Sequence, residues 1–352
     1  MRIFSHILPH WLLPVLYFSF SLFCSLNASM VRAQTYYLPK TVVRFHLLIE
    51  KETYQPGDFA RYAERYLRLT GVAQQQQVNH RVIDCHLSTI GVRDTSKCFV
   101  AHLKGKGEKA AFHLSDDGVL LAINDEPLPS PSRQFFPRTT ATPQGSQLST
   151  HSVLSAEALA AGSKAKMAEI TAQQIIDLRE QRQLLATGEA DNMPQDDQQL
   201  QYMLQRIDQQ HDQLMALFVG TTVRDTTEHQ ILYCPDSEVT HHILFRMSRR
   251  MGIVDCDDLA GVPYYISVRN LYPTEQPLLD NKKGEHLYAN IPGMARLTLQ
   301  YQDAELGSYD IPVAQFGIVE LRDGSFFKRY VTHLQLHPAT GAVVKMVCED
   351  KK

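Results

Sequence analysis

The stretch Thr41–Glu50, TVVRFHLLIE, decides the fold class, because β-branched and large apolar residues fill most of it. We therefore predict a β-strand here. The chain around it has 352 residues, of which 44% are hydrophobic and 21% charged. That composition is typical of globular proteins and suffices for about two to three domains. The net charge of −3 argues against a broad basic surface for nucleic acid.

Strand-like runs continue on both sides of a helical middle. A turn at 54–58 precedes a short helix that we expect over Phe59–Leu69. Further strands are expected at Val82–Ile90, Phe99–Lys104, Ala110–Leu114, Val119–Asn124, His229–Tyr233, Tyr264–Arg269, Ala295–Tyr301, Ser308–Val313, Phe316–Leu321, Tyr330–Leu336 and Ala342–Cys348. A helical stretch near Ser237–Met251 should interrupt them. His337–Gly341 is a turn sequence, which predicts that the last two runs form a hairpin.

Two long helices are expected in the middle of the chain. Ser163–Ala186 contains no proline or glycine, and Thr187-Gly188 ends its pattern. In the second helix, up to Phe218, apolar residues recur at heptad spacing, with His211 as the only polar member of the seam. A short connection predicts that these helices pack antiparallel. The pair carries more acidic than basic residues, which indicates either a solvated surface or a docking arm for a protein partner.

Together these patterns predict an α+β fold with two mainly antiparallel β regions and an inserted antiparallel helical hairpin. We expect an N-terminal β-rich domain at 34–126 and a C-terminal β-rich domain at 219–352. Between them we expect a Pro/Ser/Thr-rich linker at 127–151, where five prolines lie among serines and threonines, and the hairpin at 152–218.

Residues 1–33 are typical of a secretory signal peptide. Arg2 gives a positive start, Trp11–Leu26 is apolar but short for a membrane span, and Val31 and Ala33 are the small residues before Gln34. The alternatives are an uncleaved anchor and lipidation of Cys24. We expect an exported protein, periplasmic or associated with the cell envelope, without a transmembrane segment after cleavage.

An exported protein can form disulfides, because it enters an oxidising compartment. Cleavage would leave five cysteines, an odd number, so at least one stays unpaired in a monomer. The candidate local pairs are Cys85 with Cys98 and Cys234 with Cys256. The alternative is that all five are free thiols in apolar surroundings.

Two short motifs resemble those of enzymes, but the neighbouring sequence elements that their chemistry needs are missing. Ser163–Lys166 fits S-x-x-K, but no K-T-G strand accompanies it. Gly105–Ala110 fits a dinucleotide pattern, but a strand and not a helix should follow. Candidate metal ligands are His80 with His86, His241 with His242, and the acidic cluster Asp255–Asp258, and none has ligand spacing of a known zinc motif. We therefore predict no catalytic, cofactor-binding or metal-binding residues and no cofactor.

Several blocks of the sequence have a distinctive order of residues. They are YYLPKTVVR at 36–44, EKETYQPGDFARYAERYL at 50–67, IDLREQRQLLATGEADNMPQD at 176–196, DQLMALFVGTT at 212–222, IPVAQFG at 311–317 and LHPATGAVVK at 336–345. In these blocks the chain resembles the domain-of-unknown-function 4831 family of exported proteins from Bacteroides and relatives. The resemblance covers essentially the whole chain after residue 33. It implies export, and it carries over no activity and no site residues.

The leading functional hypothesis is a non-enzymatic binding or assembly module of the cell envelope, with a protein or envelope partner and no nucleic acid. The alternative is a hydrolase acting on envelope polymers or glycans, because two carboxylates at the right separation suffice for a glycosidase. Whether the protein is an enzyme stays open, and we lean against it. A cleft with two carboxylates would favour the enzyme, whereas an exposed apolar patch would favour the binding module.

The signal peptide can be tested on protein isolated from its native host. Mass spectrometry should show a chain that begins at Gln34, because the small residues at 31 and 33 fit the exit of a signal peptide. A diacylglyceryl mass on Cys24, or an intact precursor in the cytosol, would contradict this assignment.

Overall fold

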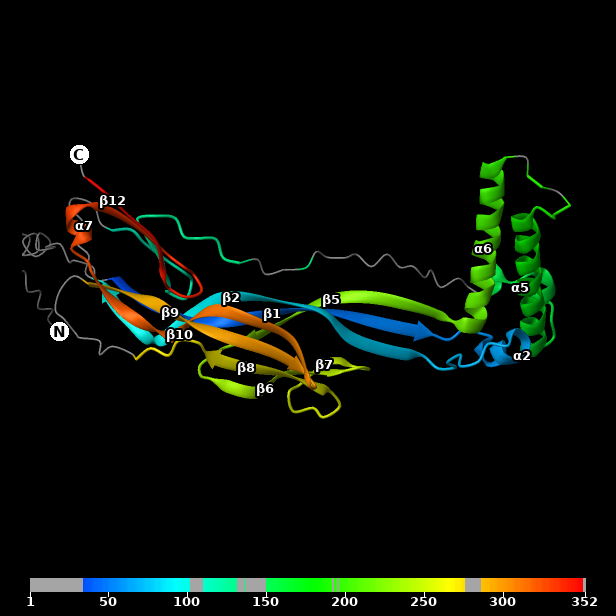
Figure 1. Cartoon of the computed structure of the whole chain (residues 1–352), viewed down its shortest axis with the longest axis horizontal. Coiled ribbons are helices and arrows are strands. Elements are labelled where there is room, and N and C mark those ends of the chain that lie inside the picture. The colour runs from blue at the N-terminus through cyan, green and yellow to red at the C-terminus, as the bar shows by residue number, and fades with distance from the viewer. Residues whose placement is uncertain are drawn as a thin grey trace, which may run out of the picture.

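The computed structural model describes residues 34–101, 110–131, 136, 150–191, 193–194, 196–275 and 286–350. The expected signal peptide, most of the Gly105–Ala110 motif and most of the expected linker lie outside the described residues. Half of the structure, 50%, is strand and 23% is helix. The strands form three antiparallel sheets, and the whole is elongated, with the longest helices at one end (Figure 1).

The first sheet has the order β2-β1-β5. Its strands are β1 (Gln34–Gln55), β2 (Gln77–Ala101) and β5 (Thr221–Tyr233). The central strand β1 extends well beyond the predicted run at both ends, and at 3.2–3.4 Å per residue its 22 residues span about 70 Å. This ribbon connects the body of sheets to the helical end (Figure 1).

The second sheet has the order β10-β9-β8-β6-β7. Its strands are β6 (Val239–Ser248), β7 (Gly252–Val254), β8 (Val262–Asn270), β9 (His286–Tyr301) and β10 (Ala304–Asp323). The helix expected near Ser237–Met251 is therefore wrong, because β6 occupies that stretch. Its apolar run is too short to give a helical period, and pairing with β8 buries Leu244 and Phe245.

The third sheet has the order β12-β11-β4-β3. Its strands are β3 (Phe112–Leu114), β4 (Leu120–Ile123), β11 (Val331–Leu336) and β12 (Val343–Glu349). The hairpin predicted at His337–Gly341 is confirmed, because Leu336 pairs with Val343 and the His337 N–H donates to the Ala342 carbonyl at 2.8 Å. β4 pairs with β11, so strands far apart in the chain share this sheet.

The largest core lies between the first and second sheets. Alternate residues of β1, among them Phe45 and Leu47, point into it and meet apolar residues of β8 and β9 such as Ile266 and Leu297. A second core joins the start of β1 to the third sheet through residues such as Tyr36, Leu38 and Leu336. The intervening residues of β1, such as His46, face away from the main core.

The predicted fold class is wrong in two respects. The structure is β-rich and not α+β, and its strands form three antiparallel sheets, two of which combine strands from both predicted β regions, because β1 pairs with β5 and β4 pairs with β11. The helices are scattered and do not form an inserted antiparallel hairpin. They are η1 (Ala60–Tyr62), α2 (Ala63–Leu67), α3 (Thr150–Val153), α4 (Ala156–Leu159), α5 (Lys164–Thr187), α6 (Asp197–Val219) and α7 (Phe326–Arg329).

The physical reason is that the helical core draws on two distant stretches of the chain. Phe59, which directly precedes η1, and Ala63, the first residue of α2, both belong to the short helix predicted at Phe59–Leu69. They pack in one cluster with residues of α4, α5 and α6. The rings of Phe59 and Phe218 lie 5.4 Å apart. Periodicity within one segment does not reveal such a partner. None of the helices in the described part of the chain has the length and apolar character of a membrane span.

The core between the first two sheets should control stability. Phe45→Ala removes a side chain that is 1% exposed, so we expect a loss of about 3–5 kcal/mol in the free energy of unfolding. The control is Ile83→Ala on the neighbouring strand β2, where the side chain is 43% exposed and the expected loss is under about 1 kcal/mol. Urea denaturation of both variants measures this, and equal losses would contradict the assigned core.

Candidate functional site

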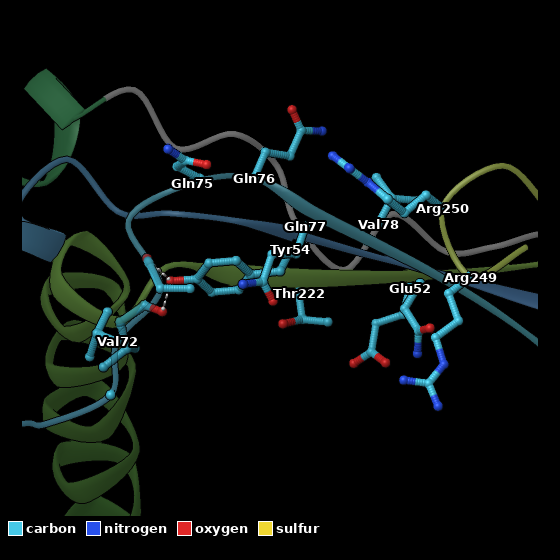
Figure 2. Close-up of a pocket in the computed structure, with 14 residues that line it drawn as sticks. Glu52, Tyr54, Val72, Gln75, Gln76, Gln77, Val78, Thr222, Arg249 and Arg250 are labelled. Atoms are coloured by element: carbon cyan, nitrogen blue, oxygen red, sulfur yellow. Dashed lines mark hydrogen bonds between the residues drawn. The ribbon is translucent and has the colours of Figure 1, made fainter. Parts of the chain in front are cut away.

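An open pocket of about 1100 Å³ lies where the first sheet meets the helical end (Figure 2). The end of β1 contributes Glu52 and Tyr54, and the end of α6 contributes Val219. The chain from Gly71 into the start of β2 forms another wall, and the turn after β6 contributes Arg249 and Arg250. Four separate parts of the chain thus converge on this pocket.

Tyr54 holds the inner wall of the pocket together. Its hydroxyl lies 2.9 Å from the Ala73 carbonyl oxygen and 3.0 Å from the Val219 carbonyl oxygen, as the dashed lines in Figure 2 show. Burial raises the pKa of Tyr54, so the phenol keeps the proton that these contacts need. The hydroxyl thereby ties both the loop before β2 and the end of α6 to β1.

The turn that carries the two arginines is fixed by its backbone. The Arg249 carbonyl accepts the His80 backbone N–H at 2.7 Å, and the His80 ring nitrogen Nδ1 lies 3.1 Å from the same oxygen. Arg249 and Arg250 are both exposed. Figure 2 shows the Arg250 side chain extending toward Gln76 and the Arg249 side chain lying beside that of Glu52. The backbone of this turn is therefore anchored to β2, and the two exposed arginine side chains extend from it.

The charge of the pocket differs from that of the whole chain. Its lining includes two arginines against a single carboxylate, that of Glu52. This carboxylate already accepts a hydrogen bond from Arg224 at 3.3 Å. The chain as a whole carries a net charge of −3. The pocket is thus a locally positive region on an acidic protein, and it attracts anions.

Amide side chains complete the polar wall. Gln75, Gln76, Gln77 and Asn79 line the pocket beside the arginines. The glutamine run gives no pattern from which a site could have been predicted, because runs of this kind are common in solvated loops. Only the approach of the turn after β6 makes it part of a site.

A second arrangement of functional groups crosses the first sheet on the face opposite to the main core. The Ser88 hydroxyl oxygen on β2 lies 2.8 Å from His46 Nε2 on β1. The other ring nitrogen, His46 Nδ1, lies 2.8 Å from Glu228 Oε1 on β5. The His46 side chain is fully buried and that of Glu228 is 16% exposed. Sequence reasoning missed this set, because its members are 42 and 182 residues apart and belong to no motif.

Neighbouring groups complete the surroundings of this line of side chains. The Phe136 backbone N–H donates to Glu228 Oε2 at 3.3 Å. The Phe136 ring lies 5.2 Å from the ring of His86. Gln230 donates to Glu228 Oε1 at 3.5 Å. Both carboxylate oxygens of Glu228 are therefore engaged, which holds the side chain in one orientation.

The structure does not join either candidate disulfide pair. All five cysteines among the described residues are free thiols. Cys85 and Cys98 lie on the same strand, β2, about 40 Å apart along an extended chain. The Cys234 thiol contacts Asp236 and Gln315, whereas the Cys256 thiol contacts the Leu244 carbonyl. Burial raises the pKa of the Cys85 thiol to about 12.

The remaining residues singled out by sequence have local structural roles. Ser163 caps α5, and its side chain accepts the Lys166 backbone N–H at 3.3 Å. His211 on α6 contacts Arg179 and Asp212 at 3.1 and 3.2 Å. Within the described residues no group of three or more His, Cys, Asp or Glu side chains is placed to hold a metal ion. That statement covers His80, His86, His241, His242 and the cluster Asp255–Asp258.

Comparison with known proteins identifies a family. The family model described as Domain of unknown function (DUF4831) matches residues 33–344, nearly the whole chain, so the chain belongs to this family and the predicted resemblance is confirmed. No curated protein and no solved structure matches the chain.

The wall of the pocket depends on a glycine between α6 and β5. Gly220 has φ +77°, and a Cβ there would lie 2.3 Å from the Gln55 carbonyl oxygen. We expect Gly220→Ala to lower the free energy of unfolding by about 3 kcal/mol or more, from backbone strain and this clash together. Gly188→Ala is the matched control, because its φ is also +77° but no atom lies within 4 Å. Its expected cost is about 1–2 kcal/mol. Urea denaturation compares the two, and a smaller loss at Gly220 would be inconsistent with the assigned contact.

Proposed function

We propose that this member of the DUF4831 family is a binding or assembly module of the cell envelope, and that the pocket at Tyr54 binds an acidic polysaccharide. The observation that carries the proposal is the pair of arginines at the pocket, set against one carboxylate that is already paired. Guanidinium groups bind carboxylates through two parallel hydrogen bonds, so they select ligands with acidic groups.

The amide wall supports a ligand that also carries hydroxyl groups. Each glutamine or asparagine side chain offers two donors and one acceptor, which suits the hydroxyls of sugars. The pocket is open, so a polymer can lie across it without an end having to enter. Acidic sugar units supply both carboxylates for the arginines and hydroxyls for the amides.

Export of the protein is part of the same proposal. The charge, apolar run and small residues of 1–33 support a signal peptide, and a protein beyond the inner membrane meets envelope polymers. The elongated arrangement supports an assembly role, because it separates the helical end from the third sheet and so presents two distant surfaces (Figure 1).

A hydrolase is the second candidate function. The line of Ser88, His46 and Glu228 is the observation that favours it. The chemistry would then be acyl transfer through a serine and not the paired-carboxylate hydrolysis of a glycosidase.

The binding proposal is tested with polygalacturonate as an acidic polymer and dextran as a neutral one. We expect the protein to bind polygalacturonate in isothermal titration calorimetry, with affinity that falls as salt is added. Arg249→Ala combined with Arg250→Ala should weaken binding by about tenfold or more, because two charge-assisted contacts are lost.

The matched control is Arg206→Ala with Arg329→Ala, which removes the same charge from exposed residues that do not line the pocket. This control should bind polygalacturonate like the unaltered protein. Binding of dextran with equal affinity, equal loss in both double variants, or no binding of polygalacturonate would each contradict the proposal.

A further inference from the structure

We propose that Ser88, His46 and Glu228 form a nucleophilic site that hydrolyses small acyl esters. This inference goes beyond the binding role of the pocket and does not depend on it. It uses different residues, and only the strands β1, β2 and β5 are common to both sites.

The connectivity of the three side chains is that of an acid, a base and a nucleophile. Glu228 contacts Nδ1 of His46, and Ser88 contacts Nε2, each at 2.8 Å. A proton on Nδ1, donated to the carboxylate, leaves the lone pair of Nε2 directed at the serine hydroxyl. His46 can then accept the proton of Ser88, and Glu228 stabilises the imidazolium that results.

The sheet preorganises this geometry. In the register of the strands, Arg44 lies opposite Ser88 and Leu48 lies opposite Glu228, with His46 between them on β1. Side chains on alternate positions of one strand share a face, so Arg44 and His46 point to the same side. Three neighbouring strands hold the groups, and catalytic groups on rigid elements lose little entropy when the reaction proceeds.

Burial strengthens the interaction between His46 and Glu228. The His46 side chain is fully buried and Glu228 is 16% exposed, so their interaction is only weakly screened by water. Arg44 lies opposite Ser88 in the register of β1 and β2, so a positively charged residue neighbours the proposed nucleophile. Ser88 is itself only partly exposed, which favours a small acyl group such as acetyl.

The proposed reaction balances without any co-reactant other than water. The Ser88 oxygen attacks the ester carbonyl carbon while its proton moves to His46 Nε2. The bond to the alcohol oxygen then breaks, and the alcohol leaves with the proton from Nε2, so that an acyl-serine remains. Water attacks this acyl group, its proton passes to His46 and then to the Ser88 oxygen, and the carboxylic acid is released.

The first test is covalent labelling with a fluorophosphonate probe. A bond forms between the Ser88 oxygen and phosphorus, fluoride leaves, and His46 takes the hydroxyl proton. We expect mass spectrometry to locate the label on Ser88. Ser88→Ala should abolish both labelling and the hydrolysis of p-nitrophenyl acetate, and His46→Asn should slow labelling by about 100-fold or more.

The matched control is Ser96→Ala. Ser96 also lies on β2 and its hydroxyl contacts a carboxylate, that of Asp94, at 2.6 Å, but its contacts within the described part of the chain include no imidazole. The variant should be labelled and should hydrolyse the ester as the unaltered protein does. Circular dichroism of each variant shows whether it folds.

Glu228 acts through His46 and is a positioning residue. Glu228→Gln keeps its size but removes its charge, so the imidazolium that forms during the reaction loses its anionic partner. The rate of labelling should therefore fall, whereas Glu228→Asp, which keeps a carboxylate at this position, should retain more of it. If Glu228 were only structural, the folded Glu228→Gln variant would be labelled as fast as the unaltered protein.

Three results would overturn the inference. They are absence of label on Ser88 in the folded protein, ester turnover that persists in Ser88→Ala, and a rate of labelling that does not fall in the folded Glu228→Gln variant. Any of them would mean that the three side chains form a structural hydrogen-bond network only. The binding of polygalacturonate would be unaffected by that outcome, so the two proposals fail independently.

Discussion

Backbone pairing along both edges of β1 is the interaction on which the rest of the structure depends. β1 hydrogen-bonds to β2 over nearly its whole length and to β5 over its second half. One set of its alternate residues, including Phe45 and Leu47, closes the core against the second sheet. The other set, including His46, faces away from this core, where polar side chains can interact. A strand with this double role has a strongly determined register, because a shift by one residue would bury the polar set.

Both candidate sites follow from that pairing. The opposite face of the first sheet brings His46 between a serine of β2 and a carboxylate of β5. The far end of the same strand carries Tyr54, which ties the helical end to the sheet and forms the wall of the pocket. A polymer retained at the pocket would lie on a protein whose neighbouring sheet face carries the proposed ester-cleaving groups. Binding and hydrolysis would then act on the same polymer.

Sequence reasoning succeeded where a signal is local. The strand at Thr41–Glu50, the helix that begins after Ser163 and the hairpin at His337–Gly341 each lie within one short pattern, and the structure contains all three. It failed where partners are distant. The stretch 239–248 is too short for periodicity to distinguish a helix from a strand, and pairing with β8 decides for the strand. Phe59 joins the core of α5 and α6, although both helices lie far along the chain from it.

The sequence by itself determined family membership, the β-rich ends of the chain and the identity of most local elements, because these depend on neighbouring residues. Only the tertiary structure decided that β1 and β5 share a sheet, that Arg249 and Arg250 meet the glutamine run, and that Ser88, His46 and Glu228 are aligned. The reason is that the register between strands is set by the burial of one whole face against another sheet. That burial is a property of the assembled core and leaves no trace in the spacing of the individual residues.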